Sequence, residues 1–222
     1  MTKRNLHLGT FAKYWEPGRV KTRLAATLGT EQAAAVYQAF VTNIVLRMQN
    51  FGASRELTIS PFSRRKEFNS FLHDLGVSDQ WDVVDQEDGN LGERMERFFH
   101  RTLAQATSVV LIGTDSPNVP VSIFDEAARI LEEKKVVLGP TEDGGYYLVG
   151  ASGSVPPIFN DVAWSTAAVW EQTTQRLEEM KIDFGILPTW YDVDEQSALD
   201  RLRSSIAESE PLLCEQLNRI LD

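Results

Sequence analysis

Two acidic loops follow two apolar runs near the middle of the sequence. Residues 109–112 are valine, leucine or isoleucine throughout, which indicates a strand buried on both faces, and Asp115 follows this run. Residues 136–138 form a second such run, and the loop after it, residues 139–146, is acidic and contains three glycines. Ligands bind at the carboxyl ends of the strands in open α/β sheets. We therefore predict that these two loops form the floor of an active site.

A basic loop follows the first predicted strand. Residues 13–24 place four cations around a Pro17-Gly18 turn. Cations neutralise phosphate charge, and a glycine lets the backbone come close to a ligand. The GxxxxGK[ST] spacing of a Walker A loop is absent. We interpret the segment as a phosphate-binding loop, with a solvated basic loop as the alternative; its cations are Lys13, Arg19, Lys21 and Arg23.

A second group of carboxylates lies late in the chain. Asp192 and Asp194 are two residues apart, so in an extended chain they point the same way. Together with Asp115 they would supply oxygen ligands for Mg²⁺ or Mn²⁺, and such a metal neutralises charge on a phosphoryl group. The alternative for Asp115 is a cap on the turn that follows its strand.

Two further segments are candidates for ligand binding. Asp143-Gly144-Gly145-Tyr146 permits close approach of a ligand, although Asp-Gly before a strand is also a common hairpin signal. Ser165-Thr166 opens a predicted helix, where these residues would cap the helix or help to bind an anion.

One loop and the three histidines complete the survey of polar groups. Residues 86–92 could shape a pocket for a base or a sugar, but a turn followed by a helix start is the simpler interpretation. The three histidines share no spacing, so a histidine metal site or a Ser-His-Asp triad has no support.

Strands and helices alternate along the chain, which predicts a three-layer α/β fold with a mostly parallel sheet. We expect residues 1–222 to form a single domain. Strands are predicted at 6–12, 55–60, 81–84, 109–112, 136–138, 146–149 and 184–187. Helices are predicted at 31–48, 64–75, 91–105, 166–180, 196–206 and 211–221, with one more between the two central strands.

The charge balance restricts the possible partners. The chain has 22 basic and 32 acidic residues, a formal net charge of −10, which argues against a nucleic-acid binder. The one cysteine, Cys214, cannot form an internal disulfide, and no stretch approaches the ~20 apolar residues of a membrane span. We expect a cytoplasmic protein without a membrane partner, and the family resemblance described next implies a nucleotide and a small-molecule acceptor as its ligands.

Six motifs occur along the chain in the order found in a known family: PGRVKTRL (17–24), GNLGERM (89–95), IGTDSP (112–117), LGPTEDGGYYLVG (138–150), WST (164–166) and DVDE (192–195). The chain is similar, over about residues 6–202, to an uncharacterised family of glycosyltransferase-like bacterial proteins in the nucleotide-diphospho-sugar transferase superfamily. More distantly it resembles the molybdenum-cofactor nucleotidyltransferases and the guanylyltransferase of deazaflavin-coenzyme biosynthesis. The resemblance implies a GT-A-like, Rossmann-type αβα sandwich.

The resemblance also suggests roles for individual residues. Nucleotide binding is expected at Lys13, Pro17, Gly18, Arg19, Lys21, Thr22, Arg23, Gly92 and Thr114. Acceptor binding is expected at Asp143, Gly144, Gly145, Tyr146, Ser165 and Thr166, and metal binding at Asp115, Asp192 and Asp194. One departure is that the molybdenum-cofactor enzymes begin with a glycine-rich loop, whereas this chain has only Gly18 there.

Three functions fit these features. The leading hypothesis is a Mg²⁺- or Mn²⁺-dependent nucleotidyltransferase, with Lys21 and Arg23 on the β- and γ-phosphates of an NTP and Asp115 on the metal. The second is a glycosyltransferase that uses a nucleotide sugar, and the four cations favour the triphosphate over it. The third is a non-catalytic nucleotide-binding module.

Overall fold

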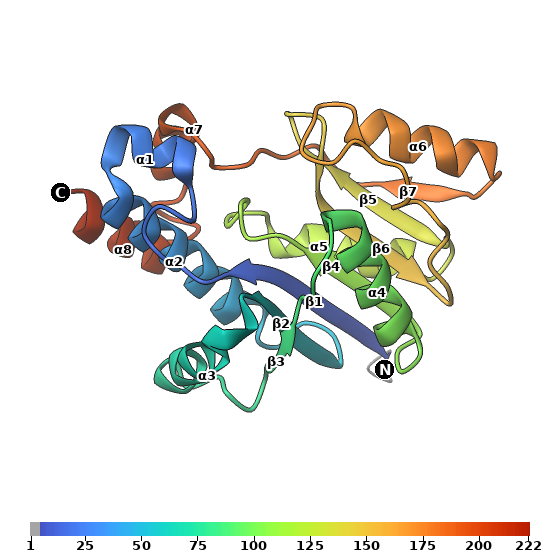
Figure 1. Ribbon diagram of the computed structural model, residues 1–222, viewed down its shortest axis with the longest axis horizontal. Helices are drawn as coiled ribbons and strands as arrows, with labels where there is room; N and C mark the ends of the chain where they lie inside the picture. The colour runs from blue at the N-terminus through green and yellow to red at the C-terminus, as the bar shows by residue number, and fades with distance from the viewer. Residues whose placement is uncertain (1–4) are drawn as a thin grey trace.

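A computed structural model describes residues 5–222, and seven strands within them form one sheet (Figure 1). The strand order is β3-β2-β1-β4-β6-β5-β7. β6 runs antiparallel to β4 and β5, and the other neighbours are parallel, which confirms the predicted α/β class. The strands are β1 (Leu6–Lys13), β2 (Ser54–Ser60), β3 (Asp82–Asp85), β4 (Ser108–Ile112), β5 (Val136–Pro140), β6 (Tyr146–Ser152) and β7 (Phe184–Ile186).

Helices cover both faces of this sheet. The helices are α1 (Thr22–Leu28), α2 (Thr30–Met48), α3 (Arg65–Asp74), α4 (Leu91–Leu103), α5 (Val121–Ile130), α6 (Val169–Glu179), α7 (Gln196–Ser205) and α8 (Pro211–Leu221), with a 3₁₀ turn at Phe62–Arg64. Apolar residues of α2, α3 and α5 form one core with the sheet, and those of α4 and α6 form a second core. The result is a three-layer αβα arrangement. No helix in the described part of the chain is both long and apolar enough to cross a membrane.

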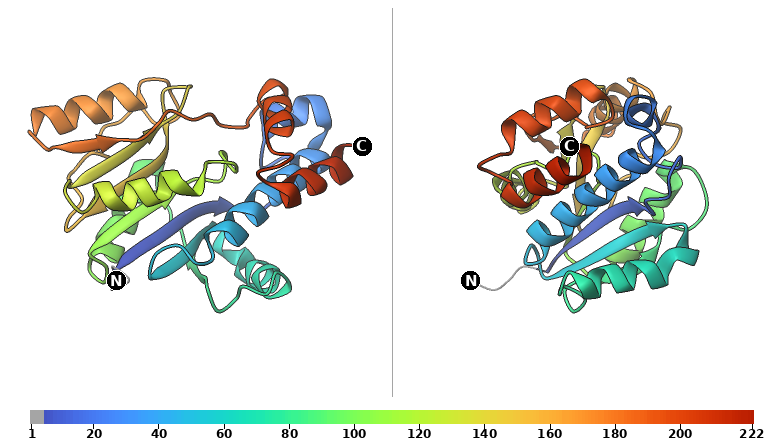
Figure 2. Two further views of the ribbon diagram at one scale, coloured as in Figure 1. Left: turned by 180° about the vertical axis from the view of Figure 1, so that it is seen from behind. Right: turned by 90° about the vertical axis from the view of Figure 1, so that its left-hand side faces the viewer.

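A third core lies beyond one end of the sheet. It joins α1, the first half of α2, α7 and α8 through buried side chains that include Leu24, Phe40 and Leu213. The segment 187–195 runs from β7 to α7 and contributes Val193 to this core (Figure 2). On its way to α7, this segment carries Asp192 and Asp194 past the carboxyl edge of the sheet.

The antiparallel strand brings its first residues to that same edge. Ile112, the last residue of β4, lies opposite Leu148 of β6. Tyr146 and Tyr147 therefore lie beside the loop that follows β4. The turn between β5 and β6 contains Gly144 with φ = 91°, so the Asp-Gly hairpin considered from the sequence is present.

Two local predictions need correction. Helix α1 was not predicted, since its seven residues are too few to show a helical pattern after a basic loop. Helix α6 begins at Val169 rather than Thr166, and its N-cap is Ala168, without a side-chain cap. Ser165 has φ = 64° and lies in the turn before α6, so it is not the cap that the sequence suggested.

Candidate functional site

Lys21 is the centre of the candidate site. Its Nζ donates hydrogen bonds to Oδ1 of Asp115 and, at 2.9 Å, to Oδ1 of Asp194. The Lys21 side chain is only 2% exposed, whereas those of Asp115 and Asp194 are 47% and 36% exposed. Burial alone lowers the pKa of Lys21, but the two carboxylates outweigh burial and hold this pKa above its usual value. The ammonium is therefore charged and shared between two partly solvated carboxylates.

The backbone conformation of Lys21 directs its side chain into the site. Lys21 has φ = 46° and ψ = 46°, which is uncommon for a residue with a Cβ, and it immediately precedes α1. The carbonyl of Lys21 accepts a hydrogen bond of 2.8 Å from the Ala25 N–H, so this residue starts the helix. The ammonium lies 6.0 Å from the ring centroid of Tyr37 and 5.5 Å from that of Phe40, both on α2.

The loop after β4 is held by a half-buried arginine of α2. Arg47 donates to the carbonyls of Pro117 at 2.7 Å and Val119 at 2.8 Å. The Val193 N–H donates to the Asp115 carbonyl at 2.8 Å, which ties this loop to the 187–195 segment. Asp115 and Asp194 are thereby brought to the same atom of Lys21 by backbone contacts between their loops.

Asp192 takes a different position from Asp194. Its Oδ1 accepts a hydrogen bond of 2.5 Å from the Ser116 hydroxyl, beside a small cavity of about 70 Å³ that both residues line. Burial, with the nearby charges of Asp115 and Asp143, raises the pKa of Asp192 to about 6, although the Ser116 hydrogen bond opposes this change. Within residues 5–222, no three acidic, histidine or cysteine side chains form a ready-made metal site.

A cleft of about 580 Å³ opens in front of Lys21. The Lys13 and Arg19 side chains on it are exposed and, within the described residues, make no ion pair. Arg23 is 67% exposed, and its guanidinium lies 3.9 Å from carboxylates of Asp194 and Glu195. Ten predicted site residues line the cleft: Lys13, Arg19, Lys21, Thr22, Arg23, Thr114, Asp115, Tyr146, Ser165 and Asp194.

Other residues predicted for nucleotide binding have structural contacts instead. Gly18 has φ = 77° in the turn after Pro17, where the Arg19 N–H donates to the Glu16 carbonyl. A Cβ on Gly92 would lie 2.4 Å from the Trp164 indole nitrogen, so this glycine lets α4 pack against the 159–164 segment. Neither Pro17, Gly18 nor Gly92 lines the cleft.

Most residues of the 142–146 turn likewise have partners within the fold. Asp143 accepts hydrogen bonds from the Thr141 hydroxyl at 2.6 Å and the Gly145 N–H at 3.2 Å. Gly144 lies against the backbone of Ala167, and its carbonyl accepts from the Trp170 N–H.

Glu142 and Thr166 also have partners within the fold. Glu142 forms hydrogen bonds of 2.9 and 3.0 Å with Arg201 of α7. Thr166 donates to the Ala163 carbonyl at 2.7 Å, which leaves Tyr146 and Ser165 as the predicted acceptor residues that line the cleft.

The cleft residues that were not predicted individually include Tyr37, Gln86 and Arg94. The Tyr37 hydroxyl accepts from the Lys13 N–H and lies 2.9 Å from the Thr114 hydroxyl, and burial raises the pKa of Tyr37 to about 12. Gln86 donates to backbone carbonyls of β1 and β2 and accepts from Arg94 at 3.3 Å. Arg94 lies inside the GNLGERM motif, but Tyr37 has no local signal beyond its place on the apolar face of a helix.

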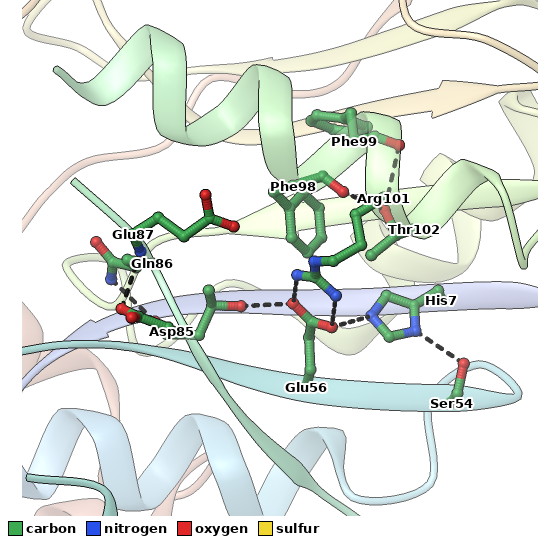
Figure 3. Close-up of polar contacts among 11 residues, drawn as sticks. His7, Ser54, Glu56, Asp85, Gln86, Glu87, Phe98, Phe99, Arg101 and Thr102 are labelled. Carbon is green, nitrogen blue, oxygen red and sulfur yellow. Dashed lines mark hydrogen bonds and ion pairs between the residues drawn. The ribbon is translucent and has the colours of Figure 1, made fainter. Parts of the chain in front are cut away.

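A buried ionic network anchors α4 at the opposite end of β1 and β2 (Figure 3). Glu56 accepts two hydrogen bonds from Arg101 of α4, of 2.8 and 2.5 Å. His7 lies between the Ser54 hydroxyl, at 2.8 Å from Nδ1, and the Glu56 carboxylate, at 3.4 Å from Nε2. Arg101 already bonds both oxygens of the Glu56 carboxylate, so we assign this network, including His7, a structural role in holding α4 against the sheet. The other end of α4 borders the cleft.

The sheet order, the three layers and the position of the cleft are those of the nucleotide-diphospho-sugar transferase fold. The chain belongs to a family described as uncharacterized proteins conserved in bacteria (DUF2064), whose model matches residues 45–166. A search of curated proteins finds no match to this sequence.

Solved structures extend the comparison to the whole chain. A protein of Desulfovibrio desulfuricans G20, provisionally assigned as a nucleotide-diphospho-sugar transferase, is 28% identical with a TM-score of 0.87 over 98% of both chains. The inositol-1-phosphate CTP transferase of T. maritima is 14% identical, with a TM-score of 0.56 over 98% of this chain and 96% of that one.

A third structure contains a metal. Rv0371C of Mycobacterium tuberculosis H37Rv in complex with manganese is 19% identical, with a TM-score of 0.50 over 90% of this chain and 99% of that one. These comparisons confirm the predicted superfamily. The finer resemblance to the molybdenum-cofactor and deazaflavin enzymes stays a prediction.

Proposed function

We propose that the chain is a divalent-cation-dependent nucleotidyltransferase that transfers a nucleoside monophosphate from an NTP to a small phosphorylated or hydroxylated acceptor. The observation that carries this proposal is the meeting of Lys21, Asp115 and Asp194 at a cleft on the carboxyl edge of the sheet. Ligands bind at this edge in open α/β folds. The solved structures of similar fold include a CTP transferase, which supports a nucleotide as one substrate.

The cations of the cleft suit a polyphosphate. Lys13, Arg19 and Arg23 line it with exposed, weakly paired side chains, and they come from β1, the following loop and α1. Three mobile charges can follow the oxygens of a triphosphate, since each charge-assisted hydrogen bond to phosphate is stronger than a neutral one. An NTP carries more negative charge than a nucleotide sugar, so this set favours the triphosphate.

The carboxylates fit a divalent cation. Asp115 and Asp194 converge on one cation already, and each keeps a second oxygen and substantial exposure. Mg²⁺ is commonly held by one or two carboxylates together with substrate phosphates, so a third protein carboxylate is not required. Asp115 and Asp194 would hold the metal, with Asp192 nearby on Ser116. A metal there supplies neutralisation of charge on the α-phosphate.

The reaction needs positioning more than a strong protein base. An acceptor oxygen would form the new bond to the α-phosphorus while the bond to the bridging oxygen breaks, and pyrophosphate would leave. A hydroxyl acceptor would release its proton to solvent, whereas a phosphate acceptor has none to release at this step. Lys13, Arg19 and Arg23 would hold the leaving pyrophosphate, and Tyr146 and Ser165 border the space left for the acceptor.

A second candidate is a glycosyltransferase with a nucleotide-sugar donor. It is favoured by the Desulfovibrio desulfuricans G20 relative, which is provisionally assigned as a nucleotide-diphospho-sugar transferase and aligns over 98% of both chains. The two reactions differ in their products, because the first releases pyrophosphate and the second releases a nucleoside diphosphate.

A thermal-shift screen followed by product analysis tests the proposal. The purified chain is mixed with each of the four NTPs and with common nucleotide sugars, with and without Mg²⁺ or Mn²⁺. A ligand at a hundredfold excess over its Kd stabilises the native state by about 2.7 kcal/mol. A metal-dependent shift with one NTP, followed by pyrophosphate release with an acceptor, is the expected result. A shift with nucleotide sugars alone, and nucleoside diphosphate as product, would replace the first candidate by the second.

A further inference from the structure

We propose that Lys21 is the resident counter-cation of the Asp115–Asp194 pair, and that a divalent metal enters this pair only by displacing the Lys21 ammonium. This inference rests on the proposed metal site at Asp115 and Asp194. It assigns Lys21 two positions: on the carboxylates without ligands, and on the nucleotide phosphates when a metal occupies the carboxylates. Metal and nucleotide would then bind in a mutually dependent way.

The contacts of Lys21 place its ammonium where a metal would lie. One nitrogen atom contacts Oδ1 of both aspartates, which come from loops 94 and 173 residues away in the sequence. The same two oxygens are the nearest protein ligands for a cation at this point. A metal bound to either of them would meet the ammonium at contact distance, where two positive charges repel strongly.

The surroundings allow the ammonium to leave without moving the backbone. The backbone of Lys21 is held by the start of α1, whereas the side chain ends at the wall of the cleft. Within the described part of the chain, the two aspartates are the hydrogen-bond partners of Nζ, and its other close neighbours are the rings of Tyr37 and Phe40. A short rotation of the flexible lysine stem would carry the charge toward phosphates in the cleft.

Charge balance favours the exchange over simple addition. Counted by themselves, the two carboxylates and Lys21 have a net charge of −1, and a divalent cation in place of Lys21 would bring the carboxylate pair to zero. The Arg23 guanidinium, 3.9 Å from Asp194, is not part of this count. Adding the metal without release would leave a net charge of +1 in a site where the lysine side chain is 2% exposed. Phosphates in the cleft offer the displaced ammonium a new anion, which explains why nucleotide would assist metal entry.

An alternative arrangement predicts the opposite result. The metal could bind the Oδ2 atoms of Asp115 and Asp194 while Lys21 keeps Oδ1 and holds both carboxylates in place. Lys21 would then be a positioning residue for the metal, and its removal would weaken metal binding.

The test is a titration with Mn²⁺ in the absence of nucleotide. The electron paramagnetic resonance signal of free Mn²⁺ measures how much of the metal is bound. Lys21→Met removes the charge, is one atom shorter than lysine and suits the neighbouring Tyr37 and Phe40 rings. Lys21→Gln is a second variant, which removes the charge but keeps a polar end. Arg19→Met is the matched control, since it removes one charge from the same loop but breaks no ion pair among the described residues. Thermal unfolding checks that each variant is folded.

The exchange predicts tighter Mn²⁺ binding to both Lys21 variants than to the wild type, by about tenfold or more, and a change under about threefold for Arg19→Met. Equal or weaker Mn²⁺ binding by the Lys21 variants than by the wild type would overturn the inference. It would also be overturned if neither the wild type nor the variants bound Mn²⁺. The measurement contains no nucleotide, so it stands apart from the proposed reaction. Absence of NTP binding or pyrophosphate release would refute the reaction without changing the Mn²⁺ result.

Discussion

Lys21 and Asp194 are 173 positions apart in the sequence, yet Nζ of the lysine lies 2.9 Å from Oδ1 of the aspartate. Asp115, on the loop after β4, accepts a hydrogen bond from the same nitrogen. Three segments that are distant along the chain therefore meet at one charge. The following predictions concern this meeting point and the contacts that hold its frame.

Replacement of Asp115 should abolish the metal dependence of NTP binding and leave the protein folded. Asp115→Asn keeps an oxygen for Lys21, and the carboxylate is 47% exposed, so the free energy of unfolding should fall by no more than about 1–2 kcal/mol. The extra stabilisation that Mn²⁺ gives an NTP complex should disappear in thermal-shift measurements. Asp125→Asn, on the exposed face of α5, is the control and should retain it. Unchanged metal dependence in Asp115→Asn would refute Asp115 as a ligand.

Arg19 should recognise the distal phosphates. Arg19→Ala is expected to weaken NTP binding by about three- to tenfold and binding of the corresponding monophosphate by less than about twofold. The reason is that its exposed guanidinium lines the cleft without an ion pair in the described residues. Isothermal titration calorimetry at constant Mg²⁺ measures both. Lys66→Ala, an exposed cation on α3, is the control. Equal losses for the two ligands would place Arg19 away from the β- and γ-phosphates.

Gly92 should be sensitive to a single added methyl group. A Cβ there would lie 2.4 Å from the Trp164 ring and 2.5 Å from the Phe159 carbonyl oxygen, so Gly92→Ala should destabilise the fold by about 1–3 kcal/mol. Gly113→Ala is the control, because a Cβ at Gly113 meets no atom within 4 Å and its φ is outside the left-handed region. Denaturant titration gives both free energies of unfolding. A loss in Gly92→Ala no larger than the control's would show that the segment at Trp164 adjusts freely.

Glu56 should make the fold sensitive to acid in a defined range. Burial raises its pKa, but hydrogen bonds from Arg101 and His7 outweigh burial and bring the pKa down from 4.5 to about 2. A depressed pKa stabilises the fold above pH 4.5, and this contribution of about 2–3 kcal/mol is lost as the pH falls toward 2. Stability measured by urea unfolding should therefore fall between pH 4.5 and 2.

The matching variant removes this dependence. Glu56→Gln should be less stable at neutral pH, since Arg101 loses its buried anion, and should show a smaller slope below pH 4.5. Glu126→Gln disrupts an exposed Glu–Arg pair on α5 and should follow the wild-type curve. If Glu56→Gln keeps the wild-type slope, another carboxylate is responsible for the acid sensitivity.

The strands were predictable because they are buried. Residues 109–112 read as a strand from their apolar side chains alone, and β4 covers Ser108–Ile112. Residues 31–48 show a helical apolar pattern, and α2 covers Thr30–Met48. Buried strands and helices consist of apolar residues at regular spacing, which can be recognised in the sequence. The apolar run 109–112 also predicted that Asp115 lies at the carboxyl edge of the sheet.

The partners of the charged groups were not predictable in the same way. Asp192 and Asp194 alternate along an extended segment, but one contacts Ser116 and the other Lys21. The Lys21 contacts depend on the path of the 187–195 segment and on a left-handed backbone at a lysine. Neither leaves a periodic signal in the sequence, so the basic loop could be assigned to phosphates but not to the carboxylates it contacts.

The late position of the 187–195 segment has a consequence for synthesis of the protein. At ribosomal rates of 5–20 residues per second, Asp194 is added roughly 9–35 s after Lys21. By the end of that interval the nascent chain contains β1 to β7, whereas α7 and α8, which cover Leu24 and Phe40, have not yet been added. The strands of the central sheet are therefore all synthesised before Asp194, which completes the contacts of the Lys21 ammonium.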